Sequence, residues 1–128
     1  ISASSSIYQT AAWGKTDQPD FMNQVVQVSC ELAPEEVLQT ILAIEKKLGR
    51  ERTEKWAART IDIDILFLGD LVKDSIKLKI PHPEIQNRRF VLQPCSDIIP
   101  KFKCLIFLCF IPILVSCSTI IPISMVWV

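Results

Sequence analysis

The chain has 128 residues, enough for a single domain, and its 14 basic side chains balance its 14 acidic ones. A net charge of zero argues against a nucleic-acid binder held by a broad basic field, so no nucleic-acid partner is expected. The five cysteines form no C-x-x-C motif and there is one histidine, which argues against a zinc site or a disulfide framework. This composition indicates a reducing, intracellular compartment. The first six residues show no secretory signal and are typical of the interior of a longer protein.

The first half of the chain predicts two paired strands followed by a helix. A short strand is expected at the end of residues 4–10, and the alternation over residues 21–32 predicts a second strand that pairs with it. Pro34 fits the first turn of a helix, and the two acidic residues after it favour the positive end of the helix dipole. Gly49 is a typical C-terminal stop. The expected apolar stripe of this helix contains Val37, Leu38, Ile41, Leu42, Ile44, Glu45 and Leu48.

Asp62-Ile63-Asp64 is the most informative motif of the chain. It lies in a strand predicted over residues 61–68, whose other members are isoleucine, leucine and phenylalanine. Residues i and i+2 of a strand share a face, so the two carboxylates should lie together, roughly 6–7 Å apart, with the isoleucines on the other face. Burying unpaired carboxylates is costly, whereas such hard oxygen ligands suit Mg²⁺. The alternative is an exposed edge strand with two solvated acids, which the apolar continuation disfavours.

The remainder of the first hundred residues predicts short elements and turns. A turn and a short polar strand are expected within residues 70–79. Pro81-His82-Pro83 predicts an extended, rigid segment, because proline restricts both itself and the residue before it. No element is predicted for residues 87–92.

The last 25 residues, 104–128, carry no charged side chain. This length would span a bilayer, although Pro112 and Pro122 interrupt it. The rival interpretation, which we favour, is translated non-coding sequence. We therefore expect a partial domain over residues 1–100, able to fold without the rest, and a hydrophobic tail over residues 101–128 that is foreign to it. A membrane location is expected only if the tail is a genuine anchor.

Four separated motifs stand in a definite order along the chain. The most specific is Gly49-Arg50 followed by Trp56 to Ile65, and the others are residues 17–23, 81–83 and 87–90. Together they resemble the 6-hydroxymethyl-7,8-dihydropterin pyrophosphokinase family, also called 2-amino-4-hydroxy-6-hydroxymethyldihydropteridine diphosphokinase, over about Ser4 to Pro100. The resemblance implies a ferredoxin-like α+β sandwich. It also implies an enzyme of folate biosynthesis that transfers pyrophosphate from ATP to 6-hydroxymethyl-7,8-dihydropterin and releases AMP.

The resemblance further implies roles for single residues. The catalytic set would be Arg59, Asp62 and Asp64, with the two acids holding two Mg²⁺ ions. The residues implied to bind ATP are Arg52, Arg59, Ile65, His82 and Arg88. Those implied to bind the pterin are Thr10, Ala11, Trp13, Phe21, Asn23, Trp56 and Phe90, where two aromatic rings form a sandwich and an amide reads the pterin edge. Alternatives stay open, since Phe21 and Phe90 could be core, Arg52 a solvated charge, His82 a structural hydrogen-bonder and Arg88 a turn cap.

The chain departs from the family pattern at both ends. The first strand of the family and its following helix are absent from the sequence, so the Asp62 strand is expected to lose its central partner. The chain as given is therefore expected to be marginally folded and inactive, and a catalytically inactive, membrane-tethered fragment is the alternative function. A different two-metal phosphoryl enzyme is a further rival. Because plant members of the family are often fused to dihydropteroate synthase in mitochondria, we also expect such a fusion in the full-length protein and a mitochondrial or cytoplasmic location.

Overall fold

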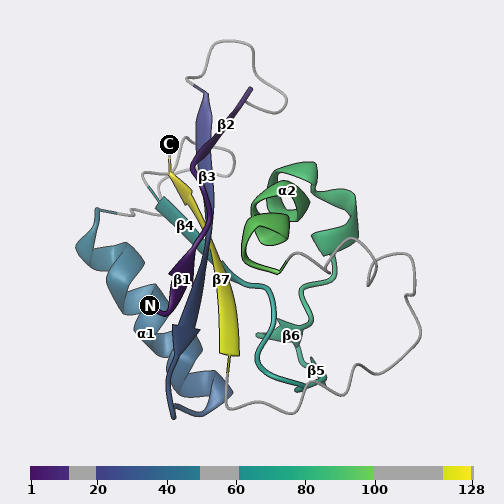
Figure 1. The fold of residues 1–128 in the computed structure, drawn as a ribbon. Coiled ribbons are helices and arrows are strands. Elements are labelled where there is room, and N and C mark those ends of the chain that lie inside the picture. The colour runs from purple at the N-terminus through teal and green to yellow at the C-terminus, as the bar shows by residue number, and fades with distance from the viewer. Residues whose placement is uncertain (12–19, 50–60, 100–119, 128) are drawn as a thin grey trace.

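The computed structural model describes residues 1–11, 20–49 and 61–99, and the backbone of residues 120–127 (Figure 1). Its elements are β1 (Ala3–Ser4), β2 (Tyr8–Thr10), β3 (Phe21–Ser29), α1 (Pro34–Lys47), β4 (Ile61–Ile65), β5 (Lys73–Asp74), β6 (Lys79–Ile80), a 3-10 turn η1 (Ile85–Asn87), α2 (Arg89–Ile98) and β7 (Ile120–Trp127). The main sheet is antiparallel and has the order β1-β3-β7-β4, with β2 also paired to β3. The expected α+β class is confirmed, and so is the pairing of β2 with β3.

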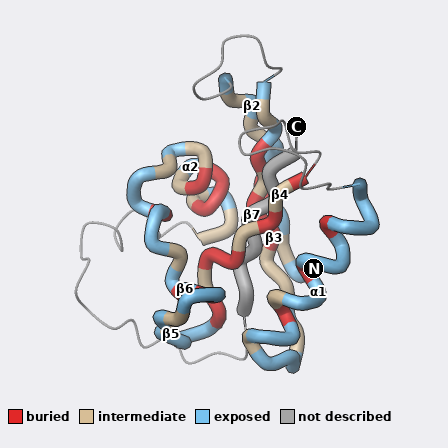
Figure 2. Tube along the Cα trace, turned by 180° about the vertical axis from the view of Figure 1, so that it is seen from behind, coloured by how far each residue is buried: buried red, intermediate tan, exposed pale blue. Residues whose placement is uncertain are grey.

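The main sheet separates two apolar cores, because α1 and α2 cover its opposite faces (Figure 1). The isoleucines of β4 pack on the α1 side, as the alternation of the motif predicts. That core consists of Val37, Ile41, Ile61, Ile63, Ile65, Leu68, Leu78 and Ile80. The core on the α2 side consists of Val25, Leu66, Ile85, Val91 and Cys95. Figure 2 shows the buried residues concentrated where the sheet meets the two helices.

α1 begins and ends where the sequence predicts. Pro34 occupies its first turn, the backbone N–H of Ala33 donates to the Glu36 carboxylate at 2.8 Å, and Gly49 after the helix has a φ of 85°, a conformation that favours glycine. The buried face is narrower than the predicted stripe. It contains Val37, Ile41 and Glu45, whereas Leu42, Ile44 and Leu48 are exposed. The reason is that α1 rests on one face of one sheet, so only a single row of side chains is enclosed.

α2 covers residues for which the sequence predicted no element. Pro94 lies inside it, and an interior proline removes a donor and disfavours a helix. Val91, Pro94 and Cys95 are nevertheless buried on its inner side, so packing on the sheet outweighs the local preference. Burial raises the pKa of the Cys95 thiol to about 12, which keeps the thiol protonated and fits a packing role.

β7 occupies the middle of the sheet. It pairs antiparallel with β3 over eight positions, from Met22↔Trp127 to Ser29↔Ile120, and with β4 over five positions, from Ile61↔Trp127 to Ile65↔Ile123. The expectation that the Asp62 strand lacks a central partner is therefore wrong, because part of the uncharged tail takes that place. The division of the chain at residue 100 is a separate matter and stays a prediction. In the part of the chain that the structure describes, no helix has the length and apolar character needed to cross a membrane.

Candidate active site

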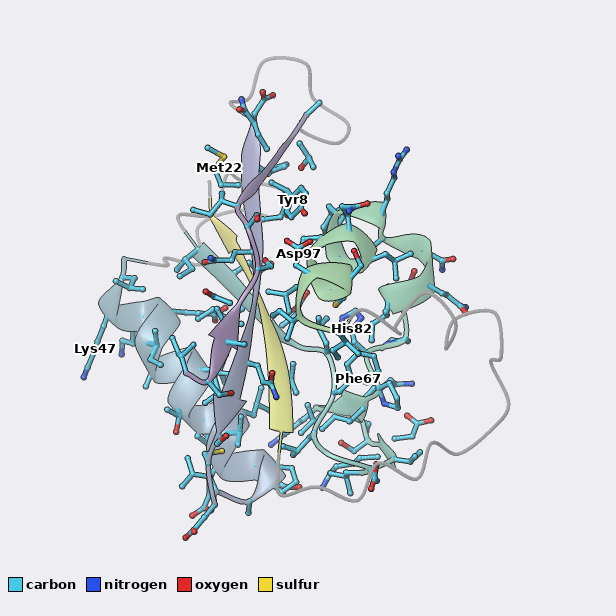
Figure 3. All side chains as sticks on the ribbon, viewed as in Figure 1. Tyr8, Met22, Lys47, Phe67, His82 and Asp97 are labelled. Carbon is cyan, nitrogen blue, oxygen red and sulfur yellow. The ribbon has the colours of Figure 1, made fainter. Side chains whose placement is uncertain are left out.

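β4 presents Asp62 and Asp64 on the α2 side of the sheet, since its isoleucines fill the α1 core. Both acids are half-buried. In the register of the sheet, Asp62 and Asn23 are both opposite Val126. Residues directly opposite one another share a face, so Asn23 lies on the face of the two acids, two strand spacings or about 10 Å from Asp62. Figure 3 shows Tyr8, His82 and Asp97 on this same side, and Met22 and Lys47 on the other.

Asp64 lies close to two residues from other parts of the chain, His82 and Arg88. The Arg88 guanidinium donates to Asp64 Oδ2 at 2.9 Å, and both side chains are about one-third exposed. His82 Nε2 lies 4.0 Å from the same oxygen, too far for a direct hydrogen bond. Arg88 stands immediately before α2, so the start of that helix sets the distance between the arginine and β4. Three of the predicted metal and ATP residues thus lie together.

His82 is held in place by its own backbone and ring. Its backbone N–H donates to the Leu66 carbonyl at 2.9 Å, and its ring Nδ1 accepts the backbone N–H of Glu84 at 3.1 Å. Because Nδ1 is an acceptor, the proton of the neutral ring belongs on Nε2, which faces Asp64. Burial lowers the pKa of His82 below its usual value, and Arg88 acts in the same direction, while Asp64 and Glu84 oppose it. His82 is therefore neutral at neutral pH in this arrangement.

Asn23 is 2% exposed and is joined to the neighbouring strand β2. Its amide nitrogen lies 2.8 Å from Thr10 Oγ1, 3.3 Å from the Tyr8 carbonyl and 3.4 Å from the Phe21 carbonyl, and donates to these oxygens. Two of the predicted pterin residues, Thr10 and Asn23, therefore form one hydrogen-bonded unit. A pterin read by Asn23 would have to bind the amide oxygen or replace one of these bonds.

The remaining described residues of the predicted pterin and ATP sets differ in their surroundings. Phe90 is half-buried against the α2-side core, and the Arg88 guanidinium lies 5.9 Å from the centre of its ring. Phe21 is half-buried and Ala11 is exposed. Ile65 packs into the α1-side core, so only its backbone could contact ATP. Trp13, Arg52, Trp56 and Arg59 lie outside the described residues.

A surface hollow in the described part of the chain does not coincide with these residues. It is an open depression of about 530 Å³ between α1 and the β5–β6 hairpin, and its lining includes Glu35, Leu38 and Ile76. None of the predicted site residues lines it. Carboxylate chemistry and the convergence of Arg88 and His82 on Asp64 locate the candidate site better than the volume of a surface depression does.

Sequence reasoning missed the role of one charged residue near the motif. Glu45 is 2% exposed, and its carboxylate accepts the backbone N–H of Ile63 at 2.8 Å. The signal was present, since residues 37, 41 and 45 stand at helical spacing on the buried face of α1 and the third is an acid. An acid at a core position is unusual enough to indicate a specific partner.

The sequence also matches the profile of a known family over most of its length. The profile of the 7,8-dihydro-6-hydroxymethylpterin-pyrophosphokinase family, abbreviated HPPK, matches residues 1–100. The chain belongs to this family. The HPPK match includes Asp62, Asp64, His82 and Arg88, and it ends before β7.

Curated HPPK relatives show how much of the family length is present. A Synechocystis protein named 2-amino-4-hydroxy-6-hydroxymethyldihydropteridine pyrophosphokinase is 48% identical over 98 residues, covering 77% of this chain and 50% of the relative. Proteins of the same name from Pseudomonas aeruginosa and Aquifex aeolicus are 41% and 40% identical, covering 79% and 76% of this chain and 62% and 61% of those proteins. The chain therefore spans between half and about three-fifths of the length of these HPPK relatives.

Proposed function

We propose that this chain carries the catalytic region of an enzyme that transfers pyrophosphate from ATP to the hydroxymethyl group of 6-hydroxymethyl-7,8-dihydropterin and releases AMP. The observation that carries the proposal is the convergence on Asp64 of Arg88, at 2.9 Å, and His82, at 4.0 Å, beside Asp62 on one face of β4. Membership in the HPPK family and the names of the relatives support this choice of reaction.

The donor set fits magnesium bound together with phosphates. Asp62 and Asp64 offer two carboxylates on one face, and no group of three or more histidine, cysteine or acidic side chains able to hold a metal occurs within the described ranges. Two acids leave coordination positions for water and phosphate oxygens, which is how Mg²⁺ is usually held in phosphoryl-transfer sites. We infer that the two acids hold two Mg²⁺ ions, which would supply positive charge to the phosphates of ATP.

Arg88 and His82 would bind and orient the nucleotide. The planar guanidinium of Arg88 can exchange a carboxylate oxygen for a phosphate oxygen, because both accept the same fork of donors. His82 in its neutral form has Nε2–H available as a donor on the same side. Arg52 and Arg59 belong to the same proposal as further phosphate contacts. With no covalent intermediate needed, catalysis would consist of positioning and charge neutralisation.

The pterin would bind along the same face towards β2. Asn23 shares the cross-strand row of Asp62, so a ligand that contacts the amide reaches towards the acids along the row. Thr10, Ala11, Trp13 and Phe21 would form the surroundings of that end, and Phe90 with Trp56 would sandwich the flat ring. The burial of Asn23 supports a recognition role, since a ligand that cannot hydrogen-bond a buried amide leaves that amide without a partner and binds more weakly.

The test is AMP release from ATP by the purified chain, measured with and without the hydroxymethylpterin and with and without Mg²⁺. AMP release that needs both supports the proposal. Phosphate release that is indifferent to the pterin would instead favour an unrelated two-metal phosphoryl enzyme. If neither turnover nor calorimetric binding of ATP and pterin is seen, the inactive-fragment alternative is favoured.

The proposed fusion partner and compartment need a different experiment. We propose that the full-length protein carries dihydropteroate synthase and resides in mitochondria or cytoplasm. Sequencing of the complete transcript would reveal a second coding region, and a tagged full-length protein would report the compartment. The same transcript would show whether a splice boundary lies near residue 101.

A further inference from the structure

Glu45 approaches the metal-binding motif from behind. It lies on α1, which covers the face of the sheet opposite to Asp62 and Asp64. Its Oε1 accepts the backbone N–H of Ile63, the residue between the two acids, at 2.8 Å. At 2% exposure, Glu45 is the charged member of the buried trio of α1, beside Val37 and Ile41.

The position of β4 explains why this bond matters. β4 stands at the end of the described sheet and has β7 as its neighbour on one side. Alternate N–H groups of such a strand point away from the neighbour and need another acceptor. Glu45 fills this need at Ile63, so a helix side chain does at one point what a further strand would otherwise do.

Burying a carboxylate is costly, and an apolar residue would pack at this position of α1 without that cost. Buried polar groups are best documented as devices that select one register. A strand that slips by one residue moves every side chain to the other face. In β4 such a slip would carry Asp62 and Asp64 into the α1 core, so the faces of the strand are set by its isoleucines, and the bond to Glu45 fixes the position of the backbone at the residue between the two acids.

We propose that Glu45 is a positioning residue for the metal site. By holding the Ile63 backbone, it sets the common orientation of the Asp62 and Asp64 carboxylates on the opposite face. The inference rests on the proposed function for its importance, since the two acids are taken as magnesium ligands. Residues that support metal ligands typically change metal affinity or activity by about 10- to 100-fold when removed.

Three variants separate positioning from general stability. Glu45→Leu keeps the volume but removes the acceptor, and Glu45→Gln keeps an uncharged acceptor. Lys46→Leu, at the exposed neighbouring position of α1, is the matched control. NMR measures the hydrogen exchange of the Ile63 amide and the carboxyl resonances of Asp62 and Asp64, and calorimetry with a non-hydrolysable ATP analogue measures Mg²⁺ affinity.

In Glu45→Leu we expect faster exchange at Ile63, displaced carboxyl resonances of both acids and about tenfold weaker Mg²⁺ binding. Glu45→Gln should recover most of this, and Lys46→Leu should match the wild type. Unchanged exchange and resonances in Glu45→Leu would overturn the proposal. If Glu45→Leu does not fold, the readout is the smaller residual change expected in Glu45→Gln, and spectra of that variant identical to the wild type would overturn the proposal. The spectra need no turnover, so an inactive wild-type protein would contradict the proposed function without deciding the role of Glu45.

Discussion

The Asp64 carboxylate is a candidate partner for two different positive groups. It is a candidate metal ligand, and its Oδ2 already accepts the Arg88 guanidinium at 2.9 Å. A metal ion and a guanidinium compete for this carboxylate, because both are attracted by its single negative charge. Under the proposed function, loading of the site with magnesium and nucleotide would therefore be coupled to movement of Arg88 from a carboxylate to a phosphate.

Replacing either acid by its amide should reduce turnover by about 100-fold while the fold persists, because each supplies charge to the metal rather than to a core. Asp64→Asn should also raise the KM for ATP more than Asp62→Asn does, since it removes the anchor of Arg88. Steady-state rates over a range of Mg²⁺ concentrations check both statements. A wild-type rate for either variant at ordinary Mg²⁺ levels would show that the replaced acid is not a ligand.

Arg88→Gln should have opposite effects on two binding constants. Without nucleotide, Mg²⁺ should bind more tightly, because the competing cation on Asp64 is gone. With nucleotide, Mg²⁺ binding should weaken, because the hydrogen bond from Arg88 to a phosphate is lost. Such a charge-assisted bond contributes about 1.5–3 kcal/mol, and less where the arginine side chain is one-third exposed. Calorimetry of Mg²⁺ alone and of Mg²⁺ with an ATP analogue measures the two constants.

The adjacent Arg89 supplies the control for that experiment. It is exposed and opens α2, so Arg89→Gln removes the same charge from the same turn. Equal behaviour of the two variants would mean that the effect is one of overall charge and that the pairing with Asp64 has no special part in it.

At the scale of elements, the sequence alone predicts a helix or strand correctly where the residues that determine it are close in sequence. Pro34 and Gly49 mark the ends of α1, and the alternation of Asp62 and Asp64 with isoleucine marks the two faces of β4. α2 could not be predicted in this way, because Pro94 argues against a helix that only the sheet stabilises. The approach of Arg88 to Asp64 depends on that helix, and so it too lay beyond the sequence.

The link between β2 and α2 offers a test at this scale. The Tyr8 hydroxyl donates to the Asp97 carboxylate, with both oxygens at 2.9 Å, and the backbone N–H of Ser6 donates to the same group at 3.0 Å (Figure 3). The hydrogen bond to Asp97 raises the pKa of Tyr8 above its usual value of 10.0. Tyr8 is the one tyrosine of the chain, so the ultraviolet absorbance of tyrosinate reports it directly.

The sign of the linked stability follows from that direction. A raised folded-state pKa means that the stabilising contribution is complete below about pH 10 and is lost as the pH rises through the folded-state pKa. Denaturant midpoints of the wild type should therefore fall above about pH 10 by more than those of Tyr8→Phe. Asp97→Asn should return the absorbance titration towards the ordinary value, and a titration unchanged by Asp97→Asn would contradict the link.

At the scale of the whole molecule, β7 joins the two parts of the site. It lies between β3, which carries Asn23, and β4, which carries the acids, and it aligns both with Val126. Such long-range placement cannot be deduced from local patterns, because the sequence of an uncharged run does not determine which strands it pairs with. The run also contains Pro122, a residue that disfavours a central strand, and this proline lies in β7 opposite Gln27.

Truncation after residue 100 should destabilise the protein strongly. Removing β7 leaves facing edges of β3 and β4 without partners, and each unpaired buried backbone group costs about 1–3 kcal/mol against a net stability of about 5–15 kcal/mol. The truncated chain should lose cooperative thermal unfolding by circular dichroism. An unchanged melting temperature would instead support the predicted boundary at residue 100 and make β7 dispensable.

The central position of β7 also has a consequence for synthesis of the chain. Every other described element precedes β7, yet the sheet closes only when β7 enters between β3 and β4. On the ribosome, those two strands must wait with open edges until residue 127 has emerged, and open strand edges are sites of intermolecular pairing. Contacts between residues about a hundred positions apart, such as Met22 with Trp127, also make this closure slow. The acids of β4 and the amide of β3 thus come into line as one of the last events of folding.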